Sequence, residues 1–141
     1  MTLRLWGTVC ACVIASGIFT SANAALVNGS ISLSGGFTPV DSVPQPTSLG
    51  TATGIDFDGT ASVDQGTGDF LASVGNTATM VDFQFSPVLS PNPVSVWSVD
   101  GFTFSMDAVA ATFQSTSFLL LTGSGTVSAT GFDDTPGTWV F

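Results

Sequence analysis

One basic side chain, Arg4, stands against ten acidic ones in this sequence of 141 residues, and all ten acids are aspartates. No Lys, Arg or His follows Arg4, so the aspartates have no other basic side chain to pair with and must be hydrated, hydrogen-bonded or bound to a metal ion. The formal charge of −9 includes the +1 of Arg4, so the residues that follow it carry −10. Burial of apolar side chains therefore has to hold this part of the chain together.

The charge balance also limits the partners. Nucleic acid is excluded, because no lysine or arginine follows Arg4 to neutralise phosphates. An anionic membrane surface is excluded for the same reason. Acidic chains with little apolar content are typically disordered, but 44% of this sequence is hydrophobic and it contains 12 Phe and 3 Trp. We therefore expect a folded domain with a packed core.

The first 24 residues have the order of a secretory signal. Arg4 is followed by an apolar stretch over residues 5–18 and by the small-residue triplet Ala22-Asn23-Ala24. The alternative, a transmembrane anchor, needs about 20 apolar residues, which is more than this stretch offers. We expect cleavage between Ala24 and Ala25, export through the Sec pathway of a Gram-negative bacterium, and a secreted or cell-surface location.

Removing residues 1–24 leaves residues 25–141, a length suited to one domain. Both cysteines, Cys10 and Cys12, lie in the expected signal, so the mature chain has neither a disulfide nor a thiol nucleophile. It is rich in Gly, Ser, Thr, Val and Phe, a composition that favours strands and turns over helices.

Apolar residues recur at alternate positions along this domain, which is the period of a strand with one buried face. The alternation is clearest in residues 27–33, 55–58, 81–85, 102–107, 126–130 and 139–141. Predicted breaks between strands include Gly35-Gly36, Gly123-Ser124-Gly125 and Thr135-Pro136-Gly137. Many short strands separated by turns predict an all-β fold, a single antiparallel β-sandwich or jelly-roll-like domain.

Three segments give sharper expectations. Asp100-Gly101, between two apolar runs, predicts a two-residue hairpin with a type I′ turn. Residues 38–49 contain three prolines and predict a surface loop. Residues 106–113 contain three alanines and fit either a helical turn or a strand, and the strand is favoured.

The mature chain lacks the side chains that usually act as acids, bases or nucleophiles near neutral pH, because it contains no His, Lys, Arg, Cys, Tyr or Glu. Two aspartate pairs remain for a carboxylate-based hydrolase, Asp133-Asp134 and Asp56 with Asp58. Asp133-Asp134 precedes Pro136-Gly137, which is more typical of a polar turn. We therefore expect no enzyme and assign no catalytic residue.

Calcium is the one cofactor that the carboxylates suggest. Asp56 and Asp58 are two residues apart and so share one face of a strand, and Asp64 follows shortly after. Calcium accepts six to eight oxygen ligands, but this segment departs from the EF-hand loop because Thr60 stands at an aspartate position and no Glu closes the loop. Asp56, Asp58 and Asp64 are the candidate calcium ligands, and an acidic, solvated strand face is the alternative.

Two tryptophans of the domain, Trp97 and Trp139, fit either a platform for sugar rings or the core. Both lie next to polar neighbours within alternating segments, which favours the core.

Several short sequence segments carry a family resemblance. They are residues 28–37 (NGSISLSGGF), 66–70 (GTGDF), 81–87 (VDFQFSP), 97–104 (WSVDGFTF), 118–126 (FLLLTGSGT) and 131–139 (GFDDTPGTW). Together they resemble exported proteins with PEP-CTERM-type sorting tails, found in Gram-negative bacteria that make exopolysaccharide. The resemblance implies a cell-surface or matrix location and carries over no site residues. The tail of that family, a Pro-containing motif, an apolar helix and a basic cluster, has no counterpart here, and we expect either a truncated sequence or a member without its tail.

These observations lead to one expected function and two alternatives. The first is a non-enzymatic structural protein of the cell surface or extracellular matrix, with exopolysaccharide or a second copy of the chain as partner, since an open last strand favours self-association. The alternative is a carbohydrate- or calcium-binding β-sandwich module, and the third is an aspartate-based hydrolase.

Overall fold

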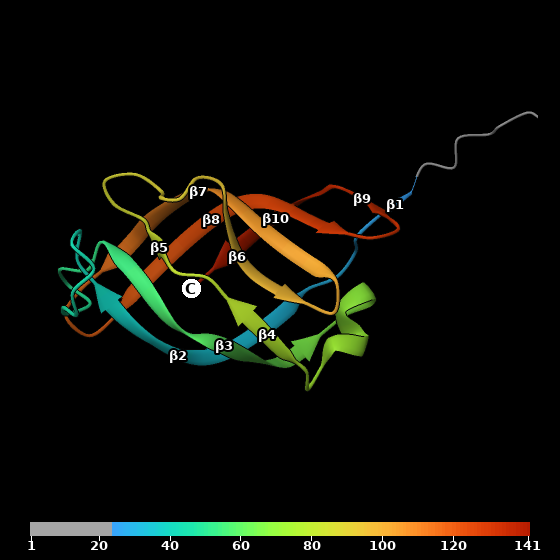
Figure 1. The fold of residues 1–141 in the computed structure, drawn as a ribbon, viewed down its shortest axis with the longest axis horizontal. Coiled ribbons are helices and arrows are strands. Elements are labelled where there is room, and N and C mark those ends of the chain that lie inside the picture. The colour runs from blue at the N-terminus through green and yellow to red at the C-terminus, as the bar shows by residue number, and fades with distance from the viewer. Residues whose placement is uncertain (1–23) are drawn as a thin grey trace, which may run out of the picture.

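The computed structural model describes residues 24–141. The expected signal, apart from Ala24, lies outside the described residues. The described part of the chain forms short and long strands and one short 3-10 helix (Figure 1). In chain order these are β1 (Ala25–Leu26), β2 (Ile31–Val40), β3 (Gly54–Gly66), η1 (Gly68–Ser73), β4 (Thr77–Met80), β5 (Phe83–Gln84), β6 (Val94–Val99), β7 (Phe102–Gln114), β8 (Leu119–Ala129), β9 (Phe132–Asp133) and β10 (Thr135–Val140).

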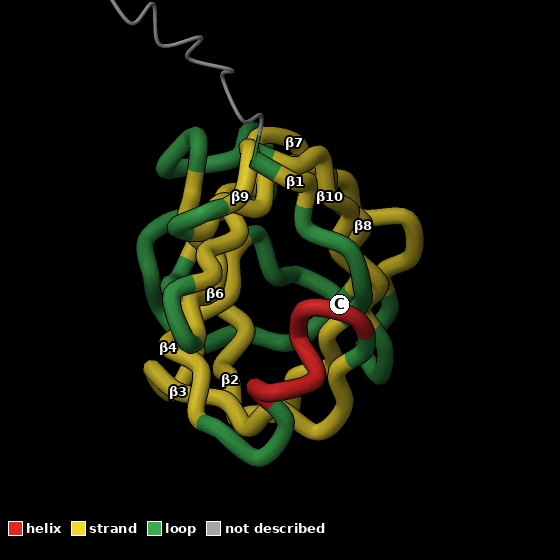
Figure 2. The backbone as a smooth tube through the Cα atoms, turned by 90° about the vertical axis from the view of Figure 1, so that its right-hand side faces the viewer, coloured by secondary structure: helices red, strands yellow, loops and turns green. Residues whose placement is uncertain are grey.

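Seven strands form one hydrogen-bonded path in the order β10-β8-β7-β6-β4-β3-β2, and every neighbouring pair is antiparallel. β5 pairs with β3 beside this path, and β1 pairs with β9 in a small parallel ribbon. The sheet curls into a half-barrel (Figures 1 and 2). The predicted all-β, antiparallel class is confirmed, although the strands form one curled sheet instead of the two sheets of a sandwich.

The concave face of the curled sheet holds the hydrophobic core. Its most deeply buried large side chains are Ile55, Val63, Val94, Val96, Phe104, Met106 and Leu121. They come from β3, β6, β7 and β8, so the core joins both halves of the sheet. Burial of one such side chain contributes roughly 1.5–3 kcal/mol, and this contribution dominates in a domain without ion pairs.

β6 buries two consecutive residues, which strict alternation along a strand does not allow. Val96 is fully buried and Trp97 is 4% exposed. The register between β6 and β7 shifts between Ser95 and Trp97, and this bulge turns both side chains toward the core.

The short helix η1 closes one end of the half-barrel. Its Phe70 is buried, with its ring centroid 4.8 Å from that of Phe102 and 6.0 Å from that of Trp97. Within residues 24–141, no helix has the length and the apolar character needed to cross a bilayer.

The hairpin between β6 and β7 is the predicted one. Asp100 and Gly101 both have positive φ angles, 50° and 86°, as a type I′ turn requires. The preference for a strand over residues 106–113 is also confirmed, since β7 runs from Phe102 to Gln114 without a helical turn.

This hairpin predicts a pH dependence. Asn76 Nδ2 donates to Asp100 Oδ2 at 2.8 Å, and hydrogen bonds from Asn76 and then Ser73 hold the pKa of Asp100 below its ordinary value of 3.8. A lowered pKa stabilises the fold above the unfolded-state value, and this stabilisation is lost as pH falls through the folded-state pKa. We expect Asp100→Asn to show a smaller fall in urea midpoint than the wild type between about pH 5 and pH 2.5. Asn76→Ala should flatten the same dependence, and parallel curves for all three proteins would contradict this assignment.

Three predicted breaks are wrong, because their glycines allow close packing inside strands. β2 continues through Gly35-Gly36 to Val40, and a β-carbon at Gly36 would overlap the carboxylate of Asp58. β8 continues through Gly123 and Gly125, where β-carbons would overlap the Met106 sulfur and the Ser105 carbonyl oxygen. Gly137 lies within β10, 3.2 Å from the ring of Phe104 when its β-carbon is built. In each case the missing side chain makes room for a neighbour.

The predicted loop over residues 38–49 begins later, because residues 38–40 belong to β2. The connection between β2 and β3 covers residues 41–53. Gln114, at the end of β7, donates from Nε2 to the carbonyl oxygens of Leu49 (2.7 Å) and Ala52 (2.8 Å), which fixes this loop against the β7–β8 hairpin.

Candidate binding cleft

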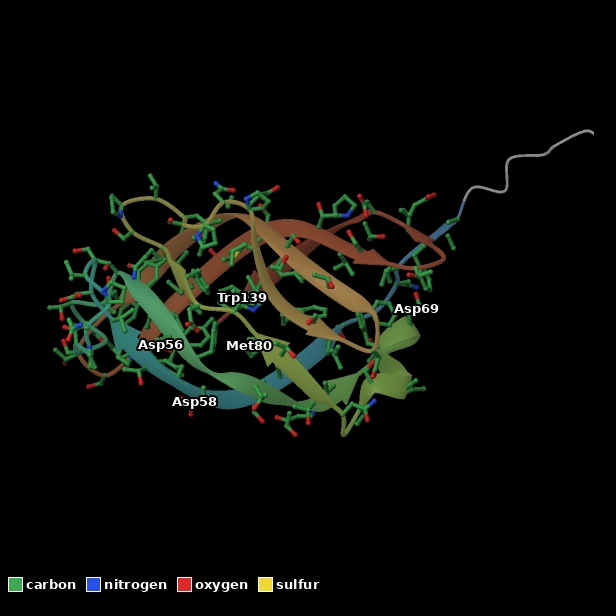
Figure 3. All side chains as sticks on the ribbon, in the orientation of Figure 1. Asp56, Asp58, Asp69, Met80 and Trp139 are labelled. Atoms are coloured by element: carbon green, nitrogen blue, oxygen red, sulfur yellow. The ribbon has the colours of Figure 1, made fainter. Side chains whose placement is uncertain are left out.

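A cleft of about 690 Å³ opens between β2 and β10, the two ends of the hydrogen-bonded path. Its walls are residues 29–35 with Phe37 on one side and residues 135–141 on the other. Its floor is the inner face of the sheet, including Phe70, Met80, Trp97, Phe104 and Val127. In Figure 3, Met80 and Trp139 lie near the centre of the view, between the two halves of the curled sheet.

An aromatic cluster closes one end of the cleft. The rings of Phe37, from β2, and Phe141, just after β10, meet edge to face with centroids 4.8 Å apart. Trp139 stacks on Phe141 at 5.7 Å and meets Phe83 at 5.8 Å. Phe57 contacts Phe141 at 6.1 Å. These rings join the two edges where no backbone hydrogen bond between β2 and β10 is found in residues 24–141.

A hydrogen bond holds the other end together. The Val27 N–H donates to Thr135 Oγ1 at 2.9 Å. Next to it, the segment before β2 is bonded to the start of η1 and to the residue before it. The N–H of Asp69 in η1 donates to the Asn28 carbonyl at 2.8 Å, and that of Thr67 donates to the Ser30 carbonyl at 2.9 Å. The cleft therefore has fixed ends and an open middle.

The two tryptophans of the domain have different environments. Trp97 is buried and stacks on Phe104 at 6.0 Å, so its predicted place in the core is confirmed. Trp139 is only half-buried and forms part of the cleft wall. The core interpretation therefore holds for Trp139 only in part.

The candidate calcium ligands lie on β3. Asp56, Asp58 and Asp64 are all exposed on the convex side of the sheet, and Figure 3 places Asp56 and Asp58 on the lower strands of the view. Across residues 24–141, no three carboxylates form a group suited to a metal ion. The structure therefore spreads these three residues along a strand face and does not bring them together.

We accordingly expect calcium to leave the melting temperature unchanged. A site occupied at about 100 times its dissociation constant would add roughly 2.7 kcal/mol to the stability of the fold. Differential scanning fluorimetry with millimolar CaCl₂, with MgCl₂ and with EDTA is the measurement. A rise specific to calcium that disappears in Asp58→Asn would instead establish a site on β3.

None of the aspartates considered for hydrolysis lines the cleft, although Asp134 directly precedes Thr135, which does. Asp134 Oδ1 accepts a hydrogen bond of 2.6 Å from Ser128, and the Asp133 carbonyl accepts one of 2.9 Å from Thr135 Oγ1. Both side chains are exposed; Asp133 ends β9, and Asp134 is the single residue between β9 and β10. The polar turn expected before Pro136-Gly137 is therefore wrong: the turn lies at Thr130-Gly131, Asp133 pairs with Leu26, and Pro136-Gly137 belong to β10.

The lining of the cleft determines what the cleft can do. It offers an apolar floor, aromatic rings, the hydroxyls of serines and threonines and the backbone of two strand edges, and none of the described lining residues is an aspartate. Such a lining can bind and orient a molecule, but it supplies no side-chain carboxylate for acid–base chemistry. Comparison of the chain with protein-family models, with curated proteins and with solved structures found no match in any of the three.

Proposed function

We propose that residues 25–141 form an exported, non-enzymatic structural module of the cell surface or the exopolysaccharide matrix, which attaches to another component through the cleft between β2 and β10. The observation that carries this proposal is the cleft itself, open in the middle, apolar at its floor and without an aspartate in its described lining. The signal-like N-terminus and the resemblance to PEP-CTERM-type exported proteins support the location.

The location is tested by producing the full chain in a Gram-negative, exopolysaccharide-forming host. We expect the protein outside the cytoplasm, with an N-terminus at Ala25 by mass spectrometry. An uncleaved chain that stays in the cytoplasm would contradict the proposal.

The role of the cleft is tested by filling it. Leu33 is half-buried and lines the cleft on β2, whereas Ser62 is exposed on the outer face of β3. We expect Leu33→Trp to release the protein from the matrix fraction into the medium, and Ser62→Trp to leave it in place. Thermal melting of both variants establishes that each is folded. Equal retention of the two variants would show that attachment does not use the cleft.

A carbohydrate-binding module is the second candidate, and Trp139 is the observation that favours it. The ring of Trp139 forms part of the cleft wall and is stacked on Phe141, an arrangement that suits contact with a sugar face. Titration with soluble exopolysaccharide should then change tryptophan fluorescence, and Trp139→Ala should abolish binding. Phe113→Ala is the control, because Phe113 is exposed near the end of β7 and does not line the cleft, and unchanged binding in Trp139→Ala would contradict this candidate.

A further inference from the structure

The two edges of the cleft run in the same direction. Six antiparallel steps separate β10 from β2 along the path, so these two strands are parallel to each other. Their starts meet where the Val27 N–H donates to Thr135 Oγ1, and their ends meet where Phe37 contacts Phe141. Two such strands cannot pair antiparallel with each other, whereas one strand running the opposite way can pair antiparallel with both.

The two edges also differ in length between these contacts. Ten residue steps separate Val27 from Phe37, and six separate Thr135 from Phe141. The extra residues are 27–30, which precede β2, are not part of a strand, and are bonded to Thr67 and Asp69. The start of this edge therefore turns toward η1 instead of lying along β10, and the cleft stays open beside it.

Backbone groups of both edges point into this opening. The Val63 N–H donates to the Asn76 carbonyl (3.0 Å), and the Val63 carbonyl accepts from the Gly75 N–H (2.9 Å), so both groups point away from β2. Leu33 lies opposite Val63 in the register of β2 and β3, and its own N–H and carbonyl therefore point away from β3, into the cleft.

The same reasoning applies to β10. Phe141 exchanges both of its backbone hydrogen bonds with Leu121 of β8, at 2.9 and 3.0 Å. Since successive residues of a strand alternate in direction, Thr138 and Val140 direct their N–H and carbonyl groups away from β8, into the cleft.

We propose that the cleft accepts an extended segment of a partner polypeptide as an eighth strand, antiparallel to both β2 and β10. This proposal rests on the proposed function, because it names the kind of molecule that the cleft holds. The inserted strand would receive main-chain hydrogen bonds on both sides and would complete an even-numbered, closed antiparallel barrel. A barrel of eight strands has an interior just wide enough for side chains to fill, so alternate residues of the segment should be apolar and face Phe104 and Trp139.

Charge specifies the other residues of the segment. Asp58 leans over Gly36 of β2, where its carboxylate occupies the space of the missing side chain. Asp64 lies further along the same outer face, and no basic residue follows Arg4 in the chain. The outward positions of the segment should therefore be Lys or Arg. A second copy of this chain carries the same formal charge of −10 after Arg4 and is repelled. This repulsion favours a basic partner over a strand from another copy of the chain.

The probe is the five-residue peptide Val-Lys-Phe-Lys-Val, which is about 13 Å long when extended and so fits between the fixed ends of the cleft, added to the purified secreted protein. Amide hydrogen exchange followed by NMR reads the two edges directly. We expect the amides of Leu33, Thr138 and Val140 to exchange fast in the free protein and to become protected together when the peptide binds. The same peptide with proline at its centre, or with Glu in place of Lys, should bind at least several-fold more weakly.

Protein variants test the two edges and the charge. Thr138→Pro removes the N–H that faces the cleft and leaves the pairing of β10 with β8 in place, so it should weaken peptide binding roughly three- to tenfold. Thr138→Val keeps the N–H and is the matched control. Asp58→Asn should weaken binding of the Lys peptide and reduce its preference over the Glu peptide.

A tethered version of the peptide tests strand insertion even where the free peptide has low affinity. Joining it to Phe141 through a short Gly-Ser linker raises its effective concentration to the millimolar range. If the amides of either edge stay unprotected in this fusion, strand insertion is wrong. If the edges stay unprotected and Leu33→Trp still releases the protein from the matrix, strand insertion is wrong but attachment through the cleft is supported. Protection of both edges with no effect of Leu33→Trp on retention would support strand insertion and contradict attachment to the matrix through the cleft.

Discussion

Phe104→Ala is expected to lower the free energy of unfolding by about 3–5 kcal/mol, the usual cost of removing a buried aromatic side chain. Phe104 is 2% exposed, stacks on Trp97 of β6, and lies opposite Gly137 of β10. Its ring therefore packs against strands from both halves of the curled sheet, and its loss leaves a cavity that neither half can fill alone. Urea denaturation followed by circular dichroism measures the change.

Phe113→Ala is the matched control, because it makes the same change on the same strand. Phe113 lies near the end of β7, is 53% exposed and contacts the equally exposed Phe118. We expect it to cost less than about 1 kcal/mol. A similar decrease in the free energy of unfolding for the two variants would show that the concave face of the sheet is not the core.

Gly68→Ala is expected to cost about 2–5 kcal/mol, from a positive φ angle and a steric overlap acting together. Gly68 has φ +56°, and a β-carbon there would overlap the Asn28 carbonyl oxygen. That oxygen accepts the hydrogen bond from the Asp69 N–H, so the methyl group would push apart the two segments that fix one end of the cleft.

Gly75→Ala separates the two causes. Gly75 has φ +85° and no atom within 4 Å of its built β-carbon, so it should lose only the roughly 1–2 kcal/mol of the backbone conformation. The melting temperatures of the two variants give the comparison. Equal losses would mean that the close approach of residues 28 and 68 is unimportant.

Local features of the fold can be predicted from the sequence, but the way in which the two ends of the curled sheet approach each other cannot. The alternation around Phe102 and Phe104 predicts a strand, and Asp100-Gly101 predicts the turn before it, because both depend on neighbouring residues. Gly123 and Gly125 wrongly predict a break, since only the packing of Met106 reveals why a side chain is missing there. The bulge at Val96 is likewise hidden in the sequence, because two adjacent apolar residues fit either face.

The cleft depends on strand order, which short-range patterns do not contain. Trp139 and Phe141 form an apolar alternation that predicts a strand, but their contact partners Phe83 and Phe37 lie more than fifty residues away in sequence. The candidate ligands Asp56, Asp58 and Asp64 do lie on one strand. Whether carboxylates converge depends on neighbouring strands, and in residues 24–141 no three of them do.

The hydrogen bond from Val27 to Thr135 joins residues 108 positions apart. Closing so long a loop costs conformational entropy before the contact can stabilise the fold. We therefore infer that this junction forms late in folding. A chain that emerges N-terminus first would already hold β2 and β3 together while β10 is still being delivered. Until then no junction holds the two edges together, so a partner strand can pair with the edge at Leu33 without having to enter between fixed ends.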